Sequence, residues 1–166
     1  MKTICKLFLF FGVVVAMSSC SNLDESAYIP QPTDELLIYN EPFTTGMGRF
    51  IEKSVTGDQK WTFHSNGYAI VTGFVSSVNH ANEDWLISPE IDLTNVAAAH
   101  LRFDHVARYF ANVGSEATVL ITDNYLPDSL PGKSTWKQLT YKPFFDPGNW
   151  DFLTTEQISL TEFANK

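Results

Sequence analysis

The sequence is short of cysteine, and this shortage limits how the folded protein can be stabilised. It contains two cysteines, Cys5 and Cys20, among 166 residues. Both lie within the first twenty residues, so no later segment supplies a partner for a disulfide. The folded part of the chain must therefore be held together by packing, with or without a bound metal.

Basic residues are also scarce. Lysine and arginine together number 11 against 19 aspartates and glutamates, a net charge of −8. The first nineteen residues contain Lys2 and Lys6 and no acid, so the chain from Cys20 onward has a net charge of −10. Nucleic acids and anionic lipid surfaces are bound by basic faces, which excludes them as partners. A neutral glycan, a cationic partner or a divalent cation stays compatible with this balance.

Motifs for enzymatic chemistry are missing. The chain has no G-x-S-x-G nucleophile motif, and Gly46-Met47-Gly48 lacks the third glycine of a nucleotide-binding loop. Glu90 and Asp92 would share one face of a strand, whereas the two carboxylates of a glycosidase usually face each other across a cleft. No spacing typical of zinc ligands joins the four histidines, His64, His80, His100 and His105. We therefore predict that the chain is not an enzyme.

No apolar run is long enough to span a bilayer. The longest, Leu7 to Ala16, has roughly ten residues, whereas a transmembrane helix takes about 20. Lys2 and Lys6 flank its start and Met17-Ser18-Ser19-Cys20 follows it, a series that resembles the lipobox of a bacterial lipoprotein. We expect a signal peptide over residues 1–19 and lipid attachment to the membrane at Cys20. The alternative is an ordinary secretory signal with Cys20 near its end by chance.

Residues 20–35 predict a flexible tether after the lipidated cysteine. They are rich in acids and prolines and show no apolar period. Asp24-Glu25 resembles the acidic export signal of surface lipoproteins in Bacteroidetes. We therefore predict an outer-membrane lipoprotein exposed on the cell surface. The alternative is a lipoprotein that faces the periplasm.

Residues 36–166 show short β-prone segments between turns. In His100 to Tyr109 the residues alternate, so that one face would carry Leu101, Phe103, His105, Ala107 and Tyr109. Asn66-Gly67, Pro131-Gly132 and Pro147-Gly148 are typical of turns. The other candidate strands are 36–39, 68–75, 117–122, 135–141 and 156–160. This series predicts an all-β domain built as an antiparallel sandwich.

A series of motifs in this region resembles the choice-of-anchor J domain of Bacteroidetes surface proteins, which is related to the cleaved adhesin modules. The resemblance runs from about Ile38 to Lys166. The motifs, of which DWLISPEIDL is the most specific, are Asn40-Glu41-Pro42-Phe43, Trp61, Asn66-Gly67-Tyr68-Ala69, Glu83 to Leu93, Leu101-Arg102-Phe103-Asp104-His105, Trp136 to Leu139, Trp150-Asp151-Phe152 and Ile158-Ser159-Leu160. It implies a jelly-roll β-sandwich of the galactose-binding and MAM type, in a non-catalytic adhesion module whose fold is commonly supported by calcium.

The resemblance has one departure at the C-terminal end. In the family, two further strands follow the segment that matches Leu160 to Lys166. We expect the sequence to be a fragment that is truncated at its C-terminus. The alternative is a sandwich that lacks one or two strands and exposes an edge.

Calcium ligands are suggested mainly by the resemblance. Glu41 stands in the opening motif and Asp104 in the matching Phe-Asp strand, and Asn66 could add an oxygen from its turn. Carboxylate and amide oxygens suit calcium. The alternative is that Glu41 and Asp104 make only surface or local hydrogen bonds.

Aromatic residues near the C-terminal end are candidates for contact with a ligand. Tyr141, Phe144, Phe145 and Trp150 lie in a stretch that is typical of a loop, and loops on a rigid sandwich often carry binding residues. Such rings could stack on the apolar face of a sugar, or they could pack inside the domain. We expect a lipid-anchored surface binding or adhesion module, with glycan as one ligand. The alternatives are a scaffold subunit that recognises a protein partner, and an accessory domain of a longer surface hydrolase.

Overall fold

The computed structural model describes residues 36–143, 148 and 150–166. By its internal contacts the chain divides into two units, Met1–Leu36 and Leu37–Lys166, and nearly all described residues belong to the second. The expected signal peptide, Cys20 and the tether lie outside the described residues. Within the part that is described, no helix has the length and apolar character needed to cross a membrane.

The described residues form short strands and almost no helix, which confirms the all-β prediction. One four-residue α-helix, α1 (Val113–Glu116), and two 3-10 turns, η1 (Pro131–Lys133) and η2 (Thr161–Phe163), interrupt the strands. The strands are β1 (Ile51–Thr56), β2 (Thr62–His64), β3 (Tyr68–Ile70), β4 (Phe74–Val75), β5 (Val78–Asn79), β6 (Glu83–Ile87), β7 (His100–Leu101), β8 (Asp104–His105), β9 (Val119–Ile121), β10 (Lys137–Leu139), β11 (Leu153–Thr154) and β12 (Ile158–Ser159).

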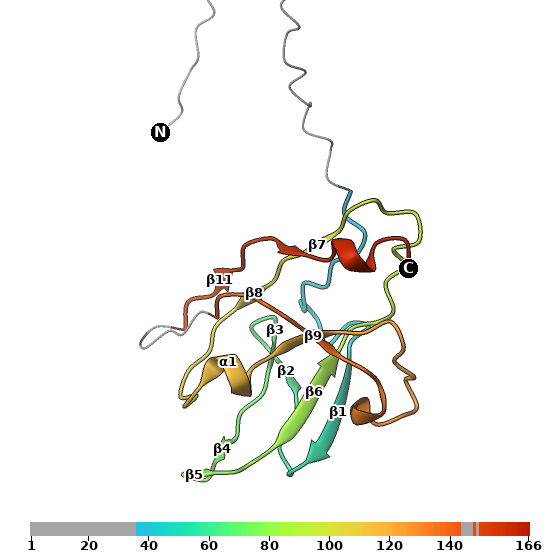
Figure 1. Cartoon of the computed structure of the whole chain (residues 1–166). Helices are drawn as coiled ribbons and strands as arrows, with labels where there is room; N and C mark the ends of the chain where they lie inside the picture. The colour runs from blue at the N-terminus through green and yellow to red at the C-terminus, as the bar shows by residue number, and fades with distance from the viewer. Residues whose placement is uncertain (1–35, 144–147, 149) are drawn as a thin grey trace, which may run out of the picture. The chain divides into compact units, whose positions relative to one another are not determined.

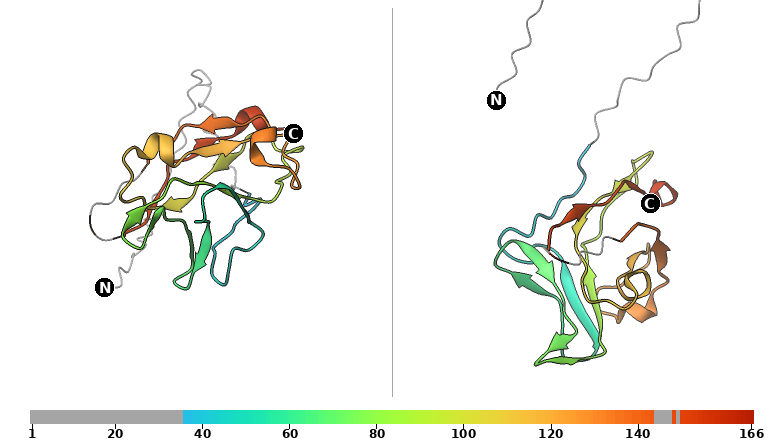
Figure 2. Two further views of the ribbon diagram at one scale, coloured as in Figure 1. Left: turned by 90° about the horizontal axis from the view of Figure 1, so that it is seen from below. Right: turned by 90° about the vertical axis from the view of Figure 1, so that its left-hand side faces the viewer.

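The strands pair as six antiparallel two-stranded sheets: β1–β6, β2–β3, β4–β5, β7–β12, β8–β11 and β9–β10. In Figures 1 and 2 the strands β1 to β6 lie on one side of the domain, and β7, β8, β11 and β12 lie on the other side. The longest pairing sets Ile51 opposite Ile87 and contains an irregularity between Ser54 and Thr56. Each sheet has two strands, and the sheets do not join into a larger closed sheet among the described residues.

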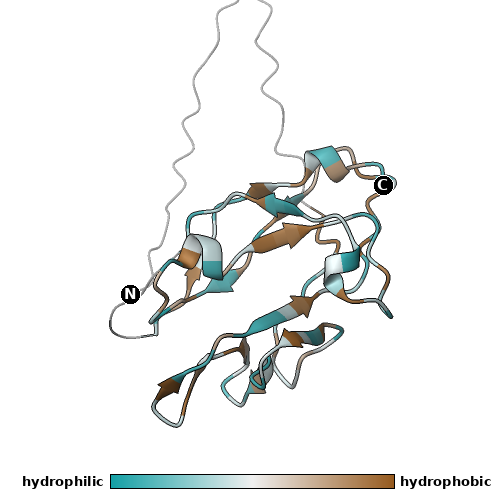
Figure 3. Ribbon diagram, turned by 60° about the horizontal axis from the view of Figure 1, so that its bottom comes forward, coloured by the Kyte–Doolittle hydropathy of each residue, from teal (hydrophilic) through white to brown (hydrophobic). Residues whose placement is uncertain are grey.

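Two hairpins owe their form to residues with positive φ. Gly67 has a φ of 86° and its N–H donates to the carbonyl of His64 at 2.9 Å, so the predicted Asn-Gly turn closes β2 on β3. Ser76 and Ser77, with φ of 51° and 65°, join β4 to β5. Figure 3 colours parts of this second hairpin as hydrophobic, and its apolar side chains are exposed, including Phe74 at 57%.

The buried apolar core is small. Trp85 on β6 packs against Trp136 with their ring centroids 5.0 Å apart, and the Trp136 indole N–H donates to the Pro131 carbonyl at 2.8 Å. These contacts join β6 to the segment before β10. Pro131 is fully buried, and the other buried apolar residues among those described are Ile87, Leu93, Ala99, Ala107, Leu139 and Ile158.

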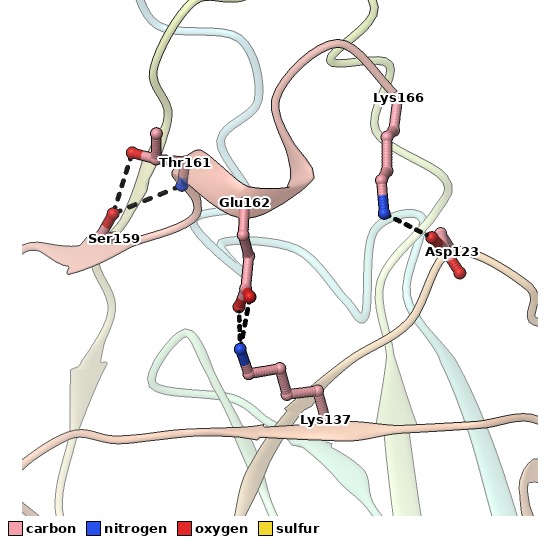
Figure 4. Close-up of polar contacts among 6 residues, drawn as sticks. All are labelled: Asp123, Lys137, Ser159, Thr161, Glu162 and Lys166. Carbon is pink, nitrogen blue, oxygen red and sulfur yellow. Dashed lines mark hydrogen bonds and ion pairs between the residues drawn. The ribbon is translucent and has the colours of Figure 1, made fainter.

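The C-terminal segment is fastened to the rest of the domain by several polar contacts. The N–H of Asn165 donates to the Leu93 carbonyl at 2.8 Å, and the Leu93 N–H donates to the Lys166 carbonyl at 3.0 Å. Figure 4 shows two ion pairs nearby, one between Lys137 and Glu162 and one between Lys166 and Asp123 at 2.9 Å.

Some strand predictions from the sequence were wrong. Residues 36–39 form no strand, and β1 was not predicted. The alternating segment His100 to Tyr109 is interrupted, with only β7 and β8 paired as strands. Alternation of burial nevertheless holds as far as Ala107, which is 7% exposed, and fails at Tyr109, which is 81% exposed. The physical reason is the positive φ of Tyr109, 63°, which turns its side chain away from the strand's buried face.

Candidate functional site

A cleft of about 730 Å³ brings together the three residues predicted to bind calcium. Glu41 comes from the segment before β1, Asn66 from the β2–β3 turn, and Asp104 from β8. Most of the remaining lining residues are aromatic or polar: Tyr39, Asn40, Pro42, Phe43, Phe50, Gly67, Tyr68, Leu101, Arg102, Phe103, Phe152 and Thr154. The convergence of residues from distant parts of the sequence makes this cleft one of two candidate sites.

Glu41 fixes the loop in which it stands. Its carboxylate accepts the backbone N–H of Phe43 at 3.1 Å and that of Arg49 at 3.4 Å. Gly48, with a φ of 58°, lets the loop approach so closely that a Cβ there would lie 1.6 Å from Glu41 Oε2. The nearby Tyr39 hydroxyl is buried and makes no hydrogen bond of normal geometry. The pKa of Tyr39 is raised, first by burial and then by the negative charge of Glu41.

Asp104 and Asn66 are held by different local contacts. Asp104 Oδ1 accepts a hydrogen bond from the Thr154 hydroxyl on the paired strand β11. The backbone N–H of Asn66 donates to His64 Nδ1 at 3.2 Å, and the His64 ring stacks on Tyr68 with centroids 4.5 Å apart. Both residues are thus positioned by the strands that flank them.

The oxygen donors of the cleft suit calcium in type, but their hydrogen bonds do not require it. Two carboxylates and an amide oxygen are the ligands that calcium prefers. Glu41 already accepts two backbone N–H groups and Asp104 accepts a hydroxyl, so neither carboxylate lacks a donor. No three His, Cys, Asp or Glu side chains in the described ranges lie close enough together to hold a metal. Glu41, Asn66 and Asp104 would supply at most part of a calcium shell of six to eight oxygens.

Tyr141, one of the predicted ligand contacts, packs inside the domain. Its hydroxyl donates to the Ala117 carbonyl at 2.9 Å. Its ring lies 5.4 Å from Phe103 and 5.5 Å from His105, measured between centroids. Burial raises the pKa of the Tyr141 hydroxyl. This geometry favours the packing alternative for Tyr141.

Trp150 belongs to an exposed cluster that is the second candidate site. Its side chain is 49% exposed and lies near Tyr109, with the two ring centroids 6.3 Å apart and the planes inclined at 63°. The Arg108 guanidinium lies 4.6 Å from the Trp150 ring centroid and 4.9 Å from that of Tyr109. Arg108 also donates to the Gly148 carbonyl at 3.1 Å. We call Arg108, Tyr109 and Trp150 the aromatic platform.

Backbone strain accompanies the aromatic platform. Trp150 has a φ of 61° and Tyr109 a φ of 63°. Bulky side chains seldom adopt this left-handed conformation, and residues that do are concentrated at functional sites. Here the strained backbone places both rings where they stay exposed beside Arg108. The other two predicted ligand contacts, Phe144 and Phe145, lie outside the described residues.

Sequence reasoning missed two members of the aromatic platform. The alternating pattern placed Tyr109 on the same face as Leu101 and Ala107, and its neighbour Arg108 therefore on the opposite face. Tyr109 and Arg108 come close to Trp150 only because the fold brings together two segments about forty residues apart in the sequence. No local pattern in the sequence predicts such a contact. Trp150 itself was found because it stands in a loop next to prolines and glycine.

Comparisons of the chain with models of protein families, with curated proteins and with solved structures find no match. The family resemblance therefore rests on the sequence motifs alone. Any function assigned to the chain depends on the geometry of the cleft and of the aromatic platform.

Proposed function

We propose that the protein is a non-enzymatic, lipid-anchored module of the outer-membrane surface that binds carbohydrate through the aromatic platform. The observation that carries this proposal is the exposed pair of rings, Tyr109 and Trp150, held beside Arg108 by a strained backbone. We also propose that the described strands belong to a jelly-roll sandwich of the choice-of-anchor J type, on the strength of the motifs and the all-β architecture.

The platform has the chemistry that sugar recognition needs. A pyranose has an apolar C–H face that can cover an aromatic ring, and hydroxyls at its rim that require polar partners. Tyr109 and Trp150 offer rings, the Tyr109 hydroxyl offers both a donor and an acceptor, and a guanidinium offers donors only. Because the ring planes are inclined at 63°, they form two walls of a corner and not one flat surface. The Arg108 guanidinium lies over both rings, so a single sugar ring or a chain end would stack on the ring faces that the guanidinium leaves uncovered.

The anchor and the cation complete the proposal. Lipid at Cys20 and the segment 20–35 would hold the domain at the membrane, where the net charge of −10 of the chain from Cys20 onward disfavours contact with anionic headgroups. Calcium bound by Glu41, Asn66 and Asp104 would link the segment before β1 to β8 across the cleft. That bridge would stabilise the domain without taking part in chemistry.

A glycan array read with the soluble chain from Ser21 onward tests the binding proposal. Trp150→Ala and Tyr109→Ala should each weaken a positive signal by about tenfold or more, because a buried aromatic anchor contributes about 2 kcal/mol to binding. Phe74→Ala is the matched control, since Phe74 on the β4–β5 hairpin is an exposed ring whose exposure, 57%, lies between that of Trp150 (49%) and that of Tyr109 (81%). Loss of sugar binding in the control but not in the platform variants would contradict the proposal.

The rival function is a scaffold subunit that recognises protein, and the β4–β5 hairpin favours it. Phe74, Val75 and Val78 are exposed together at 57%, 38% and 54%. Apolar groups gathered on a protein surface are typical of interaction sites. An array without signal, together with a stoichiometric protein partner whose binding is lost in Phe74→Ala, would replace the glycan proposal by this one. Hydrolysis of a glycan panel that a single carboxylate substitution abolishes would contradict both.

A further inference from the structure

The β4–β5 hairpin belongs to a long stretch of the chain that has no charged side chain. No Asp, Glu, Lys or Arg stands in residues 61–82, between Lys60 and Glu83. The chain from Cys20 onward has a net charge of −10, so two copies repel each other wherever their charged surfaces come together. The hairpin is therefore a part of the molecule that a second copy can approach without setting like charges against its side chains.

The hairpin is short and its turn is strained. Its ladder has two residue pairs, and it lies at one end of the domain (Figure 1). The turn residues, Ser76 and Ser77, have a positive φ, which is a strained conformation for any residue except glycine. The side chains of Phe74, Val75 and Val78 stay exposed. Isolated two-stranded hairpins are marginally stable in water, so a further strand would stabilise this one.

One edge of the hairpin is closed by hydrogen bonds and the other is open. The His80 N–H donates to the Gly73 carbonyl at 2.7 Å, so these two residues form a hydrogen-bonded pair. Bonded and non-bonded pairs alternate in an antiparallel ladder, so the next pair, Phe74 and Asn79, turns its backbone N–H and carbonyl groups outward. On β4 the Phe74 N–H donates to the Thr72 hydroxyl at 3.1 Å, and that hydroxyl donates to the Phe74 carbonyl at 3.4 Å. On β5 no hydrogen bond among the described residues occupies the outward groups of Asn79.

We propose that β5 pairs antiparallel with β5 of a second copy of the chain, with Asn79 opposite Asn79 of that copy. The N–H of each Asn79 then donates to the carbonyl of the other, an exchange that fits a two-fold axis and uses both outward groups. The two hairpins become one sheet of four strands in the order β4–β5–β5–β4, and the outer edges of that sheet are the ones that Thr72 closes. This pairing is independent of sugar binding at the aromatic platform.

The interface is small, so the pair is weak in solution. Stable complexes bury roughly 1,200 Å² or more, which two short strands and their apolar side chains do not reach. Copies anchored in one membrane meet at a much higher effective concentration than free copies. The proposed lipid at Cys20 would therefore favour the pair, although the geometry of the pairing does not need it.

Disulfide cross-linking at single cysteines tests the pairing, because the chain from Ser21 onward has no cysteine of its own. In a hydrogen-bonded antiparallel pair the two Cα atoms lie about 5.5 Å apart, within the range of about 4.4–6.8 Å that a disulfide spans. Asn79→Cys keeps the backbone groups that pair, so it should form covalent dimers when oxidised glutathione is added.

Ser77→Cys is the matched control because Ser77 is also exposed and stands on the same hairpin. In the proposed register Ser77 lies opposite Ala81 of the second copy. Four residues, or about 13 Å along the strand, then separate the two Ser77 positions, too far for a disulfide. We expect Asn79→Cys to cross-link at least about tenfold faster than Ser77→Cys.

Substitutions of Val78 separate strand pairing from chance collision. In the Asn79→Cys chain, Val78→Asp adds a negative charge to the pairing strand of both copies and should slow cross-linking to the rate of Ser77→Cys. Val78→Thr, which is β-branched and uncharged, should leave cross-linking fast. Equal rates at the two cysteine positions, faster cross-linking at Ser77→Cys, or fast cross-linking in Val78→Asp would overturn the inference.

The unaltered chain from Ser21 onward gives a second measurement that needs no cysteine. As the protein is concentrated, the backbone amide signal of Asn79 in a ¹H–¹⁵N spectrum should shift, because its N–H acquires a partner. The amide signal of Gly67, which is bonded within the β2–β3 hairpin, should stay in place. An Asn79 signal that does not move with concentration would contradict the pairing.

Discussion

Replacing Gly48 by alanine should loosen the loop around Glu41 for two separate reasons. Alanine at a φ of 58° is strained by about 1–2 kcal/mol relative to glycine. In addition, its Cβ would lie 1.6 Å from Glu41 Oε2, so the carboxylate must move away. The hydrogen bonds from the N–H groups of Phe43 and Arg49 are then lost, which costs about 1–2 kcal/mol at this partly exposed position. We expect the free energy of unfolding to fall by about 2–4 kcal/mol.

Urea unfolding followed by tryptophan fluorescence measures this change, and the chain offers two controls. Gly46→Ala should cost less than about 0.5 kcal/mol because nothing lies within 4 Å of the new Cβ and its φ is not positive. In a Glu41→Ala background the carboxylate is absent, so Gly48→Ala should cost only its backbone strain. The two substitutions should therefore show a coupling energy of about 1–2 kcal/mol. Equal costs of Gly48→Ala in both backgrounds would refute the proposed contact.

Three further predictions concern the anchor, the core and the C-terminal segment. Cys20→Ala should block acyl labelling and release the protein from the membrane fraction; continued labelling would contradict the lipobox. Burial lowers the pKa of His105 below its ordinary 6.5, against opposing effects of the Leu153 backbone and Asp104. The stability that His105 contributes is thus present above pH 6.5 and lost as the pH falls, so melting temperatures at pH 7.5 and 5 should differ less in His105→Phe than in the unaltered chain. Lys137→Met should cost less than about 1 kcal/mol because its ion pair with Glu162 is exposed, and a larger loss in urea unfolding would show that this pair is essential for docking the C-terminal segment.

The all-β class and several turns could be predicted because they depend on local residue types. Asn66-Gly67 supplies the positive φ that a tight hairpin needs, and the alternation from Leu101 to Ala107 matches the burial that the fold produces. The β1–β6 pairing could not be predicted because it joins segments about thirty residues apart, and β1 itself alternates weakly. The outward orientation of the Tyr109 side chain could not be predicted either, because its positive φ is a conformation that tyrosine rarely adopts.

The candidate sites were predicted unevenly for the same reason. Glu41, Asn66 and Asp104 share a cleft, but they were selected through the motif resemblance and not through spacing.

The central claim is that carbohydrate binds at the aromatic platform, and the indole N–H resonances of the tryptophans test it most directly. The indole N–H groups of Trp61, Trp85 and Trp136 donate within the domain, to the Asp84 carbonyl, to Glu83 Oε1 and to the Pro131 carbonyl respectively. In a ¹H–¹⁵N spectrum titrated with a glycan selected from the array, only the Trp150 indole signal should shift, and Tyr109→Ala should suppress that shift. Movement of the Trp61, Trp85 or Trp136 signals with Trp150 unchanged would contradict the claim and place the ligand elsewhere.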